Sequence, residues 1–191
     1  MTVHRWQGTF GDLYVERNLS ALSLPKRGQF WDGLFTKYPV ESVIEVGSGA
    51  GANLRHLRAK RIVGVDVNES ALKIARLLPD VLAIRADAAR IPLPDQAFEM
   101  SLCVGLLIHI PDHELLNVMD ELWRLSSKYI FVGEYDAPRT TEVEYRGERG
   151  LLWKRPYRDL FLARFVLTAI DEGFLAQEDG FDNVTWTLFQ K

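Results

Sequence analysis

Cysteine is scarce in this chain of 191 residues, and long apolar runs are missing from it. The one cysteine, Cys103, cannot form an internal disulfide, and its apolar neighbours predict a buried thiol without a catalytic role. The longest apolar run, 102–110, is interrupted by Gly105 and His109, so it does not predict a membrane span. The first residues also lack the apolar stretch of a secretory signal. Together these absences favour a cytoplasmic protein without membrane contact.

A strong excess of either charge is absent as well. The 23 Lys and Arg residues are opposed by 26 Asp and Glu residues, which gives a formal net charge of −3. A slightly acidic chain is not expected to bind nucleic acid without specificity. Basic residues do gather between positions 146 and 158, but Glu142, Glu144 and Glu148 are interleaved with them. We therefore expect a small-molecule partner and no nucleic acid.

The alternation of apolar segments predicts a single α/β domain, which also fits the length of the chain. Strands are expected at 42–46, 62–66, 81–84, 98–104 and 129–134. Helices are expected near 51–59, 69–77, 112–125 and 157–172. This order predicts a doubly wound, mostly parallel sheet. Two late strands, 174–176 and 184–189, surround a turn at Asp179-Gly180 and predict a C-terminal antiparallel hairpin.

A glycine-rich turn follows the first expected strand. Gly47, Gly49 and Gly51 alternate with small residues, which lets the backbone turn tightly and come close to a ligand. Glu45 lies at the carboxyl end of the strand before this turn. The next strand ends at Asp66, about twenty residues past the turn, where the ribose of a nucleotide would present its hydroxyl groups. A dinucleotide-binding turn or a plain tight βα turn remains an alternative interpretation.

Two further segments complete a recognisable pattern. After the ExGxGxG of residues 45–51 come GVD at 64–66, ADA at 86–88 and IPLPDQAF at 91–98. In this combination the chain resembles class I S-adenosylmethionine (SAM)-dependent methyltransferases, which implies SAM as the cofactor and a seven-stranded Rossmann-like sheet. The resemblance also implies a position along SAM for each acidic residue: Glu45 near the methionine amino group, Asp66 at the ribose hydroxyls, and Asp87 with Ala88 against the adenine. The residues expected to bind the cofactor are Glu45, Gly47, Gly49, Gly51, Asn53, Asp66, Asp87, Ala88, Gly105, Tyr14 and Asn18.

Motifs along nearly the whole chain carry a narrower resemblance. They are Trp6-x-Gly8-x-Phe10-Gly11-x-x-Tyr14-x-x-Arg17-Asn18, residues 105–110, Glu134-Tyr135, residues 144–147, Lys154-Arg155 and Thr185-Trp186-x-Leu188-Phe189. With these motifs the chain is similar to the pseudaminic acid biosynthesis-associated methylase family, a small class I methyltransferase group linked to modified nine-carbon sugars. Glu99 departs from many methyltransferases, which carry Asp before the fourth strand.

The N-terminal segment carries an aromatic stripe. Trp6, Phe10 and Tyr14 recur every four residues, which predicts a helix with an apolar face that covers something. We expect residues 1–40 to form a helical cap or lid and residues 41–191 to form the SAM-dependent methyltransferase domain. The resemblance implies that Tyr14 and Asn18 reach the amino-acid end of SAM. Plain packing of this helix on the domain is the alternative.

Candidate residues for the methyl acceptor stand at the ends of the fourth and fifth strands. Glu134 ends an apolar strand, where a carboxylate costs free energy unless it is paired or bound to a cation. Glu144 and Tyr145 follow in a charged loop, and His109 follows the fourth strand. We expect these four residues to be catalytic. In this hypothesis Glu134 holds a cationic nitrogen, and His109 is a general base or a polar wall.

Paired carboxylates suit a planar cation. N-methylation of a guanidino or amidino group, as in free arginine, a guanidino metabolite or an amidino sugar, is therefore the expected reaction. O- or N-methylation of a nine-carbon or amino sugar with His109 as the base is one alternative, and a SAM-binding module without turnover is another. No metal is expected, because Pro111 separates His109 from His113 and no third ligand is apparent. The expected partner is a small polar molecule, and a homodimer is one option for the assembly.

Overall fold

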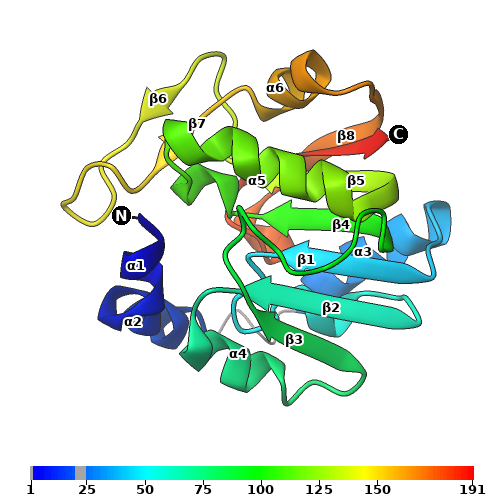
Figure 1. The fold of residues 1–191 in the computed structure, drawn as a ribbon, viewed down its shortest axis with the longest axis horizontal. Coiled ribbons are helices and arrows are strands. Elements are labelled where there is room, and N and C mark those ends of the chain that lie inside the picture. Colours follow the sequence, from blue (N-terminus) through cyan, green and yellow to red (C-terminus); the bar gives the residue numbers. More distant parts are fainter. Residues whose placement is uncertain (1, 20–24) are drawn as a thin grey trace.

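A sheet of seven strands lies at the centre of the part of the chain that the structure, a computed structural model, describes: residues 2–19 and 25–191 (Figure 1). The strands are β1 (Ser42–Val46), β2 (Arg61–Asp66), β3 (Val81–Arg85), β4 (Phe98–Val104), β5 (Ser126–Glu134), β8 (Thr168–Leu175) and β9 (Val184–Gln190). Their order across the sheet is β3-β2-β1-β4-β5-β9-β8. Strands β1 to β5 are parallel, whereas β9 is antiparallel to both β5 and β8. The predicted doubly wound, mostly parallel sheet with a C-terminal antiparallel hairpin is confirmed.

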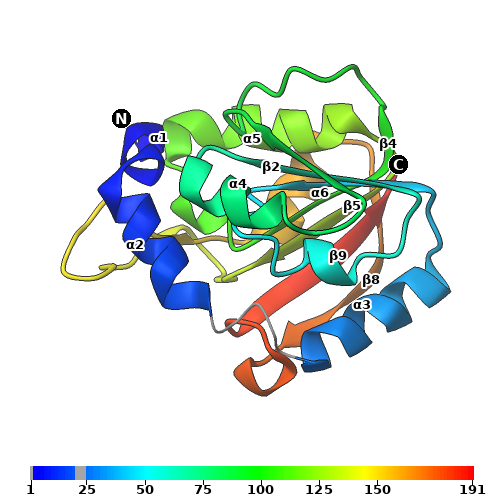
Figure 2. The ribbon, with the colours of Figure 1, turned by 90° about the horizontal axis from the view of Figure 1, so that it is seen from below.

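Helices cover both faces of this sheet (Figure 2). Helices α5 (Asp112–Leu125) and α6 (Tyr157–Arg164) pack on one face, and α3 (Pro25–Lys37) and α4 (Glu69–Ala75) pack on the other. Every residue of β1 is buried, as expected for a parallel strand between two helical layers. The buried residues of α5 recur three and four positions apart, which is the spacing of one helix face: Leu115, Val118, Met119, Leu122 and Leu125.

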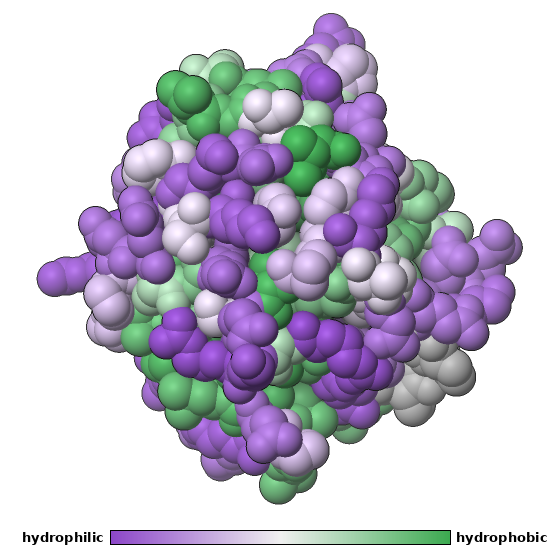
Figure 3. Space-filling model, turned by 90° about the vertical axis from the view of Figure 1, so that its right-hand side faces the viewer, coloured by the Kyte–Doolittle hydropathy of each residue, from purple (hydrophilic) through white to green (hydrophobic). Residues whose placement is uncertain are grey.

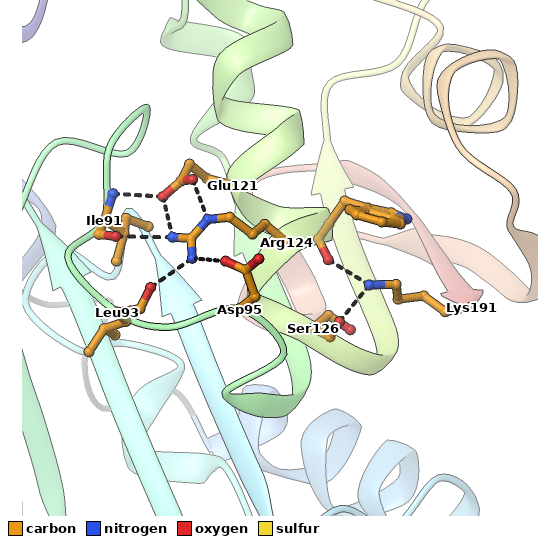
Figure 4. Close-up of polar contacts among 8 residues, drawn as sticks. Ile91, Leu93, Asp95, Glu121, Arg124, Ser126 and Lys191 are labelled. Atoms are coloured by element: carbon orange, nitrogen blue, oxygen red, sulfur yellow. Dashed lines mark hydrogen bonds and ion pairs between the residues drawn. The ribbon is translucent and has the colours of Figure 1, made fainter.

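A polar network fixes the C-terminal end of α5 (Figure 4). The guanidinium of Arg124 donates to the carboxylates of Glu121 and Asp95 and to the carbonyls of Ile91 and Leu93. Glu121 also accepts the backbone N–H of Ile91 at 2.7 Å. The network therefore holds the connection between β3 and β4 against the helix.

Two of the predicted helices are wrong. In place of a helix at 51–59 the chain makes turns and a three-residue 3-10 helix, η2 (Leu54–His56). Gly51 has a φ of +82°, outside the right-handed helical region, and Leu57 is already extended with a ψ of 145°. The helix expected at 157–172 ends at Arg164, and β8 begins at Thr168. Residues 168–175 pair with β9, so the sheet overrides the local helical pattern.

Two separate segments lie beyond the carboxyl ends of the parallel strands (Figure 1). One consists of α1 (Thr2–Gln7) and α2 (Thr9–Asn18). The other consists of the short antiparallel strands β6 (Thr141–Glu142) and β7 (Trp153–Lys154) and the loop between them. Helix α3, in contrast, places Trp31 fully inside the core of the domain.

The opposite side of the molecule has a mixed surface (Figure 3). Hydrophilic residues are interspersed there with small apolar patches. Over residues 2–19 and 25–191, none of the helices combines the length and the apolar character that crossing a bilayer requires.

Candidate functional site

A cavity of about 370 Å³ opens at the carboxyl ends of β1, β2 and β4. This is where open α/β sheets bind ligands. The residues of the predicted cofactor set that line it are Glu45, Gly47, Gly49, Asn53, Asp66, Asp87, Ala88, Gly105, Tyr14 and Asn18. The tertiary structure thus brings ten of the eleven predicted cofactor-binding residues, all but Gly51, to a single cavity.

The glycine turn forms the floor of the cavity. Gly47 and Gly49 have φ values of +74° and +53°, a region that side chains disfavour. A methyl group on Gly47 would stand 2.8 Å from the Leu106 side chain, whereas one on Gly49 would meet no atom within 4 Å. Gly47 is therefore needed for packing, and Gly49 keeps the cavity open.

Gly51 is the exception and corrects the prediction. It is buried, does not line the cavity, and a methyl group on it would stand 2.7 Å from the Leu78 side chain. Its small size serves the contact between the turn and the end of α4, because that contact leaves no room for a side chain.

Asp66 stands at the end of β2 with both carboxylate oxygens engaged. Oδ2 accepts the backbone N–H of Gly49 at 2.8 Å, and Oδ1 accepts that of Asn68 at 2.8 Å. Burial raises the pKa of Asp66, and these two N–H groups oppose that rise. Each oxygen keeps a second lone pair, so the carboxylate can still accept hydroxyl groups from the cavity.

Glu45 lies in an almost closed polar pocket with Arg27 and Asn53. Its Oε1 accepts the Asn53 amide at 2.6 Å, while Oε2 is buried without a partner among the described residues. Burial raises the pKa of Glu45 to about 8, although the nearby Arg27 guanidinium lowers it. Arg27 itself donates to Asn53 Oδ1 and to the Gly180 carbonyl. A buried carboxyl group and a buried guanidinium side by side suit a zwitterionic amino-acid group.

Sequence reasoning did not find Arg27. It stands on α3 outside every motif, and only the fold brings it across to the glycine turn.

At the other end of the cavity, Asp87 Oδ1 accepts the backbone N–H of Ala89 at 2.9 Å. That contact fixes the turn that carries Ala88, which lines the cavity and is buried.

Helices α1 and α2 cover part of the cavity. Trp6, Tyr14 and Asn18 line it, and Trp6 packs edge to face against Phe10 and Tyr14 with centroid separations of 5.1 and 5.4 Å. Burial raises the pKa of Tyr14. Asn18 donates to the Tyr14 carbonyl, which fixes the end of α2. These positions fit a cover over the cavity.

Asn68 ties these helices to the cofactor end of the sheet. Its Oδ1 caps α4 by accepting the Ala71 N–H, and its Nδ2 donates to the Trp6 carbonyl and to Asp12. Its backbone N–H is the donor to Asp66. One residue thus links the cover, the helix α4 and the carboxylate at the ribose position.

His109 lies on the cavity wall in the 3-10 helix η3 (Leu107–His109). Its Nδ1 is 2.7 Å from the carbonyl oxygen of Leu151. A carbonyl only accepts, so Nδ1 carries the proton and Nε2 keeps a lone pair. Burial lowers the pKa of His109 to about 4, so the ring is neutral near pH 7. The ring packs between Trp6 and Tyr145, with centroid separations of 4.6 and 5.3 Å.

The structure does not bring Glu134 or Glu144 to the cavity. Glu134 is buried and accepts the backbone N–H groups of Leu106, Leu107 and Ile108 at 3.0, 2.8 and 3.2 Å. These donors account for a buried carboxylate at the end of β5 without a cationic acceptor. Glu144 is exposed and absent from the lining. The two carboxylates expected to hold the acceptor are therefore misplaced, whereas Tyr145 and His109 do line the cavity.

Several lining residues were not anticipated. They are Trp6 as a wall, Leu106, Ile108, Glu114, Arg146, Leu152, Phe181 and Asp182. The narrower family resemblance did single out some of the segments that contain them, such as residues 105–110 and 144–147. Nothing in the local sequence marks Asp182, which follows the 3-10 helix η4 (Gln177–Asp179).

Residues 43–128 match the family model described as a methyltransferase domain. The matched segment contains the glycine turn, Asp66, Asp87 and His109. The chain carries a methyltransferase domain and is a SAM-dependent methyltransferase. No curated protein matches the methyltransferase.

Solved structures share the fold of this methyltransferase. One is the Burkholderia thailandensis 1,6-didemethyltoxoflavin-N1-methyltransferase with bound substrate and S-adenosylhomocysteine (TM-score 0.76, 14% identity, 99% of this chain and 87% of that chain). Another is the magnesium protoporphyrin IX methyltransferase of Synechocystis PCC 6803 with S-adenosylhomocysteine (TM-score 0.70, 15% identity, 98% and 97%). A third is a possible histamine N-methyltransferase from Thermotoga maritima (TM-score 0.65, 17% identity, 98% and 97%).

The residues of the cavity fit SAM, the cofactor of this methyltransferase. Glu45 keeps one buried oxygen free for an ammonium group, and Gly49 leaves room where a side chain would intrude. Asp66 and Asp87 stand further along the same cavity, at the strand ends that the ribose and the base would reach.

Proposed function

We propose that this methyltransferase acts on a small planar acceptor and that His109 takes the proton which the acceptor loses. The position and protonation state of His109 carry the proposal. The ring is neutral, its Nδ1–H is held by the Leu151 carbonyl, and it borders the cavity. Nε2 has no hydrogen-bond partner among the described residues, so its lone pair is free to take a proton from an acceptor O–H or N–H.

The proposed chemistry is an in-line displacement. The acceptor oxygen or nitrogen attacks the SAM methyl carbon, the bond between that carbon and sulfur breaks, and its electron pair stays on sulfur as S-adenosylhomocysteine forms. The acceptor proton moves to His109 Nε2 and then to solvent. Catalysis of such a step comes mainly from holding the reactants in line, and a positioned base adds to it.

The low pKa of His109 narrows the acceptor class. A ring whose conjugate acid has a pKa of about 4 is a weak base, so it suits an acidic proton better than that of an aliphatic alcohol. Phenols, enols and ring N–H groups of heterocycles carry such protons. The first acceptor class is therefore an aromatic or heteroaromatic O–H or N–H compound.

The walls of the cavity support a planar acceptor. Trp6, Tyr135 and Tyr145 line it beside His109 and provide aromatic surfaces for stacking. The Burkholderia thailandensis enzyme of similar fold is a 1,6-didemethyltoxoflavin-N1-methyltransferase, so its acceptor atom is a nitrogen. That likeness agrees with the proposal.

A cationic acceptor is the second candidate. Asp182 lines the cavity, and its charge contributes to the raised pKa values of Tyr14 and Tyr135. A carboxylate beside tyrosine rings suits a guanidino, amidino or amino group. Amidino sugars and nine-carbon sugars, which the narrower family resemblance suggests, belong to this second class of acceptor.

Formation of S-adenosylhomocysteine in an acceptor screen tests the proposal. The panel contains phenols and N–H heterocycles, guanidino and amidino compounds including arginine, and amino and nine-carbon sugars. We expect turnover with the first group and a loss of about 10²- to 10⁴-fold in His109→Ala. His113→Ala is the matched control, because that histidine is exposed and does not line the cavity.

Each other outcome points to a different function. Turnover of cations alone, with activity lost in Asp182→Asn and kept in His109→Ala, would establish the second candidate in place of the first. SAM binding without S-adenosylhomocysteine from any acceptor would indicate a binding module instead.

A further inference from the structure

We infer that Glu134 and Arg155 are positioning residues that hold the 106–110 loop, and with it His109, from two sides. Neither residue lines the cavity, and both are almost completely buried. The inference rests on the proposed role of His109, which this loop carries. Neither the cofactor nor the acceptor explains this buried carboxyl group and this buried guanidinium.

Glu134 binds the loop through its backbone N–H groups. Oε1 accepts from Leu106 at 3.0 Å and from Leu107 at 2.8 Å, and Oε2 accepts from Ile108 at 3.2 Å. Consecutive N–H groups that point to one carboxylate form an anion-binding turn. The carboxylate thus fixes the orientation of three successive peptide groups just before His109.

Arg155 binds the same loop through its carbonyl groups. Its Nη1 donates to the Leu107 carbonyl at 3.0 Å, and its Nη2 donates to the Ile110 carbonyl at 2.9 Å. Nη2 also contacts Asp112 Oδ1 at 2.8 Å, at the start of α5. The planar guanidinium therefore joins the loop to the helix that follows it.

The two contacts are complementary because a loop exposes N–H groups on one side and carbonyls on the other. A buried carboxylate and a buried guanidinium each cost free energy unless hydrogen bonds satisfy them. Here the loop backbone supplies hydrogen bonds to both side chains. At Leu107, for example, the N–H donates to Glu134 and the carbonyl accepts from Arg155. Removing either charge leaves unsatisfied backbone groups in the loop, so the loop geometry depends on both.

A displaced loop would move both halves of the active site. His109 lies on η3 and relies on the Leu151 carbonyl for its tautomer, so a rotated loop breaks that hydrogen bond. Leu106 lies against Gly47 of the glycine turn, as its closeness to the position of a Gly47 side chain shows. We therefore expect a strong effect on methyl transfer and a weaker one on SAM binding.

Amide hydrogen exchange and NMR of the His109 ring test the inference in the full chain, without an acceptor. Glu134→Gln keeps the shape of the side chain but turns an NH₂ group toward the loop N–H groups. We expect exchange at Leu106, Leu107 and Ile108 to become about ten- to hundredfold faster, as for lost bonds to a charged group. The His109 Nδ1–H signal should shift or disappear at the same time.

Glu121→Gln is the matched control. Glu121 likewise accepts a backbone N–H, that of Ile91, but its partners Ile91 and Arg124 lie outside the 106–110 loop (Figure 4). We expect it to speed exchange at Ile91 and to leave the His109 signal unchanged. A shift of the His109 signal in both variants would show general loosening and overturn the inference.

Arg155→Lys keeps the inference testable if Glu134→Gln does not fold. Lysine retains the charge but cannot reach two carbonyls with a planar fork, so we expect faster exchange in the loop and an intermediate shift of the His109 signal. Unchanged exchange at Leu107 and an unchanged His109 signal in either folded variant would refute the positioning role. Methyl transfer that survives in His109→Ala would contradict the proposed function while leaving the loop result intact.

Discussion

Protonation of Glu45 is the residue-scale feature that most directly reports cofactor binding. Burial raises the pKa of the free carboxyl to about 8. At pH 7 it is therefore mostly protonated in the absence of SAM. An ammonium group at Oε2 favours the ionised form, so SAM binding should release a proton.

We expect calorimetric titration with SAM at pH 7 to show proton release, seen as a binding enthalpy that varies with the ionisation enthalpy of the buffer. The sign follows from the raised pKa: below pH 8 the free site holds the proton, and affinity should rise as the pH approaches 8. Glu45→Gln should bind SAM more weakly and release no proton through this site. A wild-type enthalpy that is the same in every buffer would contradict the contact.

The glycines of the turn make a second residue-scale prediction. Gly49→Ala adds a methyl group that meets no protein atom but stands beside the cavity, so the protein should fold and bind SAM less tightly. Gly51→Ala adds one that meets Leu78, so it should lower stability by about 1–3 kcal/mol, as overpacking does.

Both variants also place alanine at a positive φ, which costs a similar amount in each. The difference between them therefore isolates the contact. Thermal unfolding measures the stability of the two variants, and SAM titration measures their affinity for the cofactor. Equal SAM affinity in Gly49→Ala and wild type would place the cofactor elsewhere.

At the scale of elements, Asn68 connects α4 with the helices α1 and α2. Asn68→Ser keeps a hydroxyl that can cap α4 but removes the Nδ2 donor to Trp6 and Asp12. We expect little change in the melting temperature, because the cap survives. SAM affinity and turnover should fall, because the cover is no longer tied down.

The measurements for Asn68→Ser are differential scanning fluorimetry and SAM titration. Deletion of residues 1–20 is the stronger form of the same test. A folded deletion variant with normal SAM affinity and turnover would show that α1 and α2 only pack on the domain.

At the scale of the whole molecule, the cofactor should stabilise the fold. A ligand at about 100 times its dissociation constant adds about 2.7 kcal/mol. For a chain of this length that corresponds to a rise of about 5–11 °C in melting temperature. Asp66→Ala should weaken SAM binding by about 1–3 kcal/mol and reduce the rise at the same concentration to about two-thirds or less. Fluorimetry with S-adenosylhomocysteine checks this, and Asp159→Ala, an exposed carboxylate away from the cavity, is the control.

Most of the cofactor half of the site follows from local sequence patterns. Strands β1, β2 and β3 and the glycine turn are local patterns, and parallel strands bring their carboxyl ends to one edge of the sheet. Asp66 and Asp87 could therefore be placed at a common cavity from their positions after the strands. The bounds of α5 were also predictable, because its apolar face repeats at helical spacing.

The acceptor half of the site, and Arg27 in the cofactor half, depend on contacts between residues far apart in the sequence. Glu134 ends its strand as predicted, but the 106–110 loop folds back and directs three N–H groups to its carboxylate. Arg27 and Asp182 reach the cavity from opposite ends of the chain. Likewise, residues 168–172 form a strand because β9 offers them a partner. Contacts between residues far apart in sequence leave no periodic trace in it, so these features became visible only in the fold.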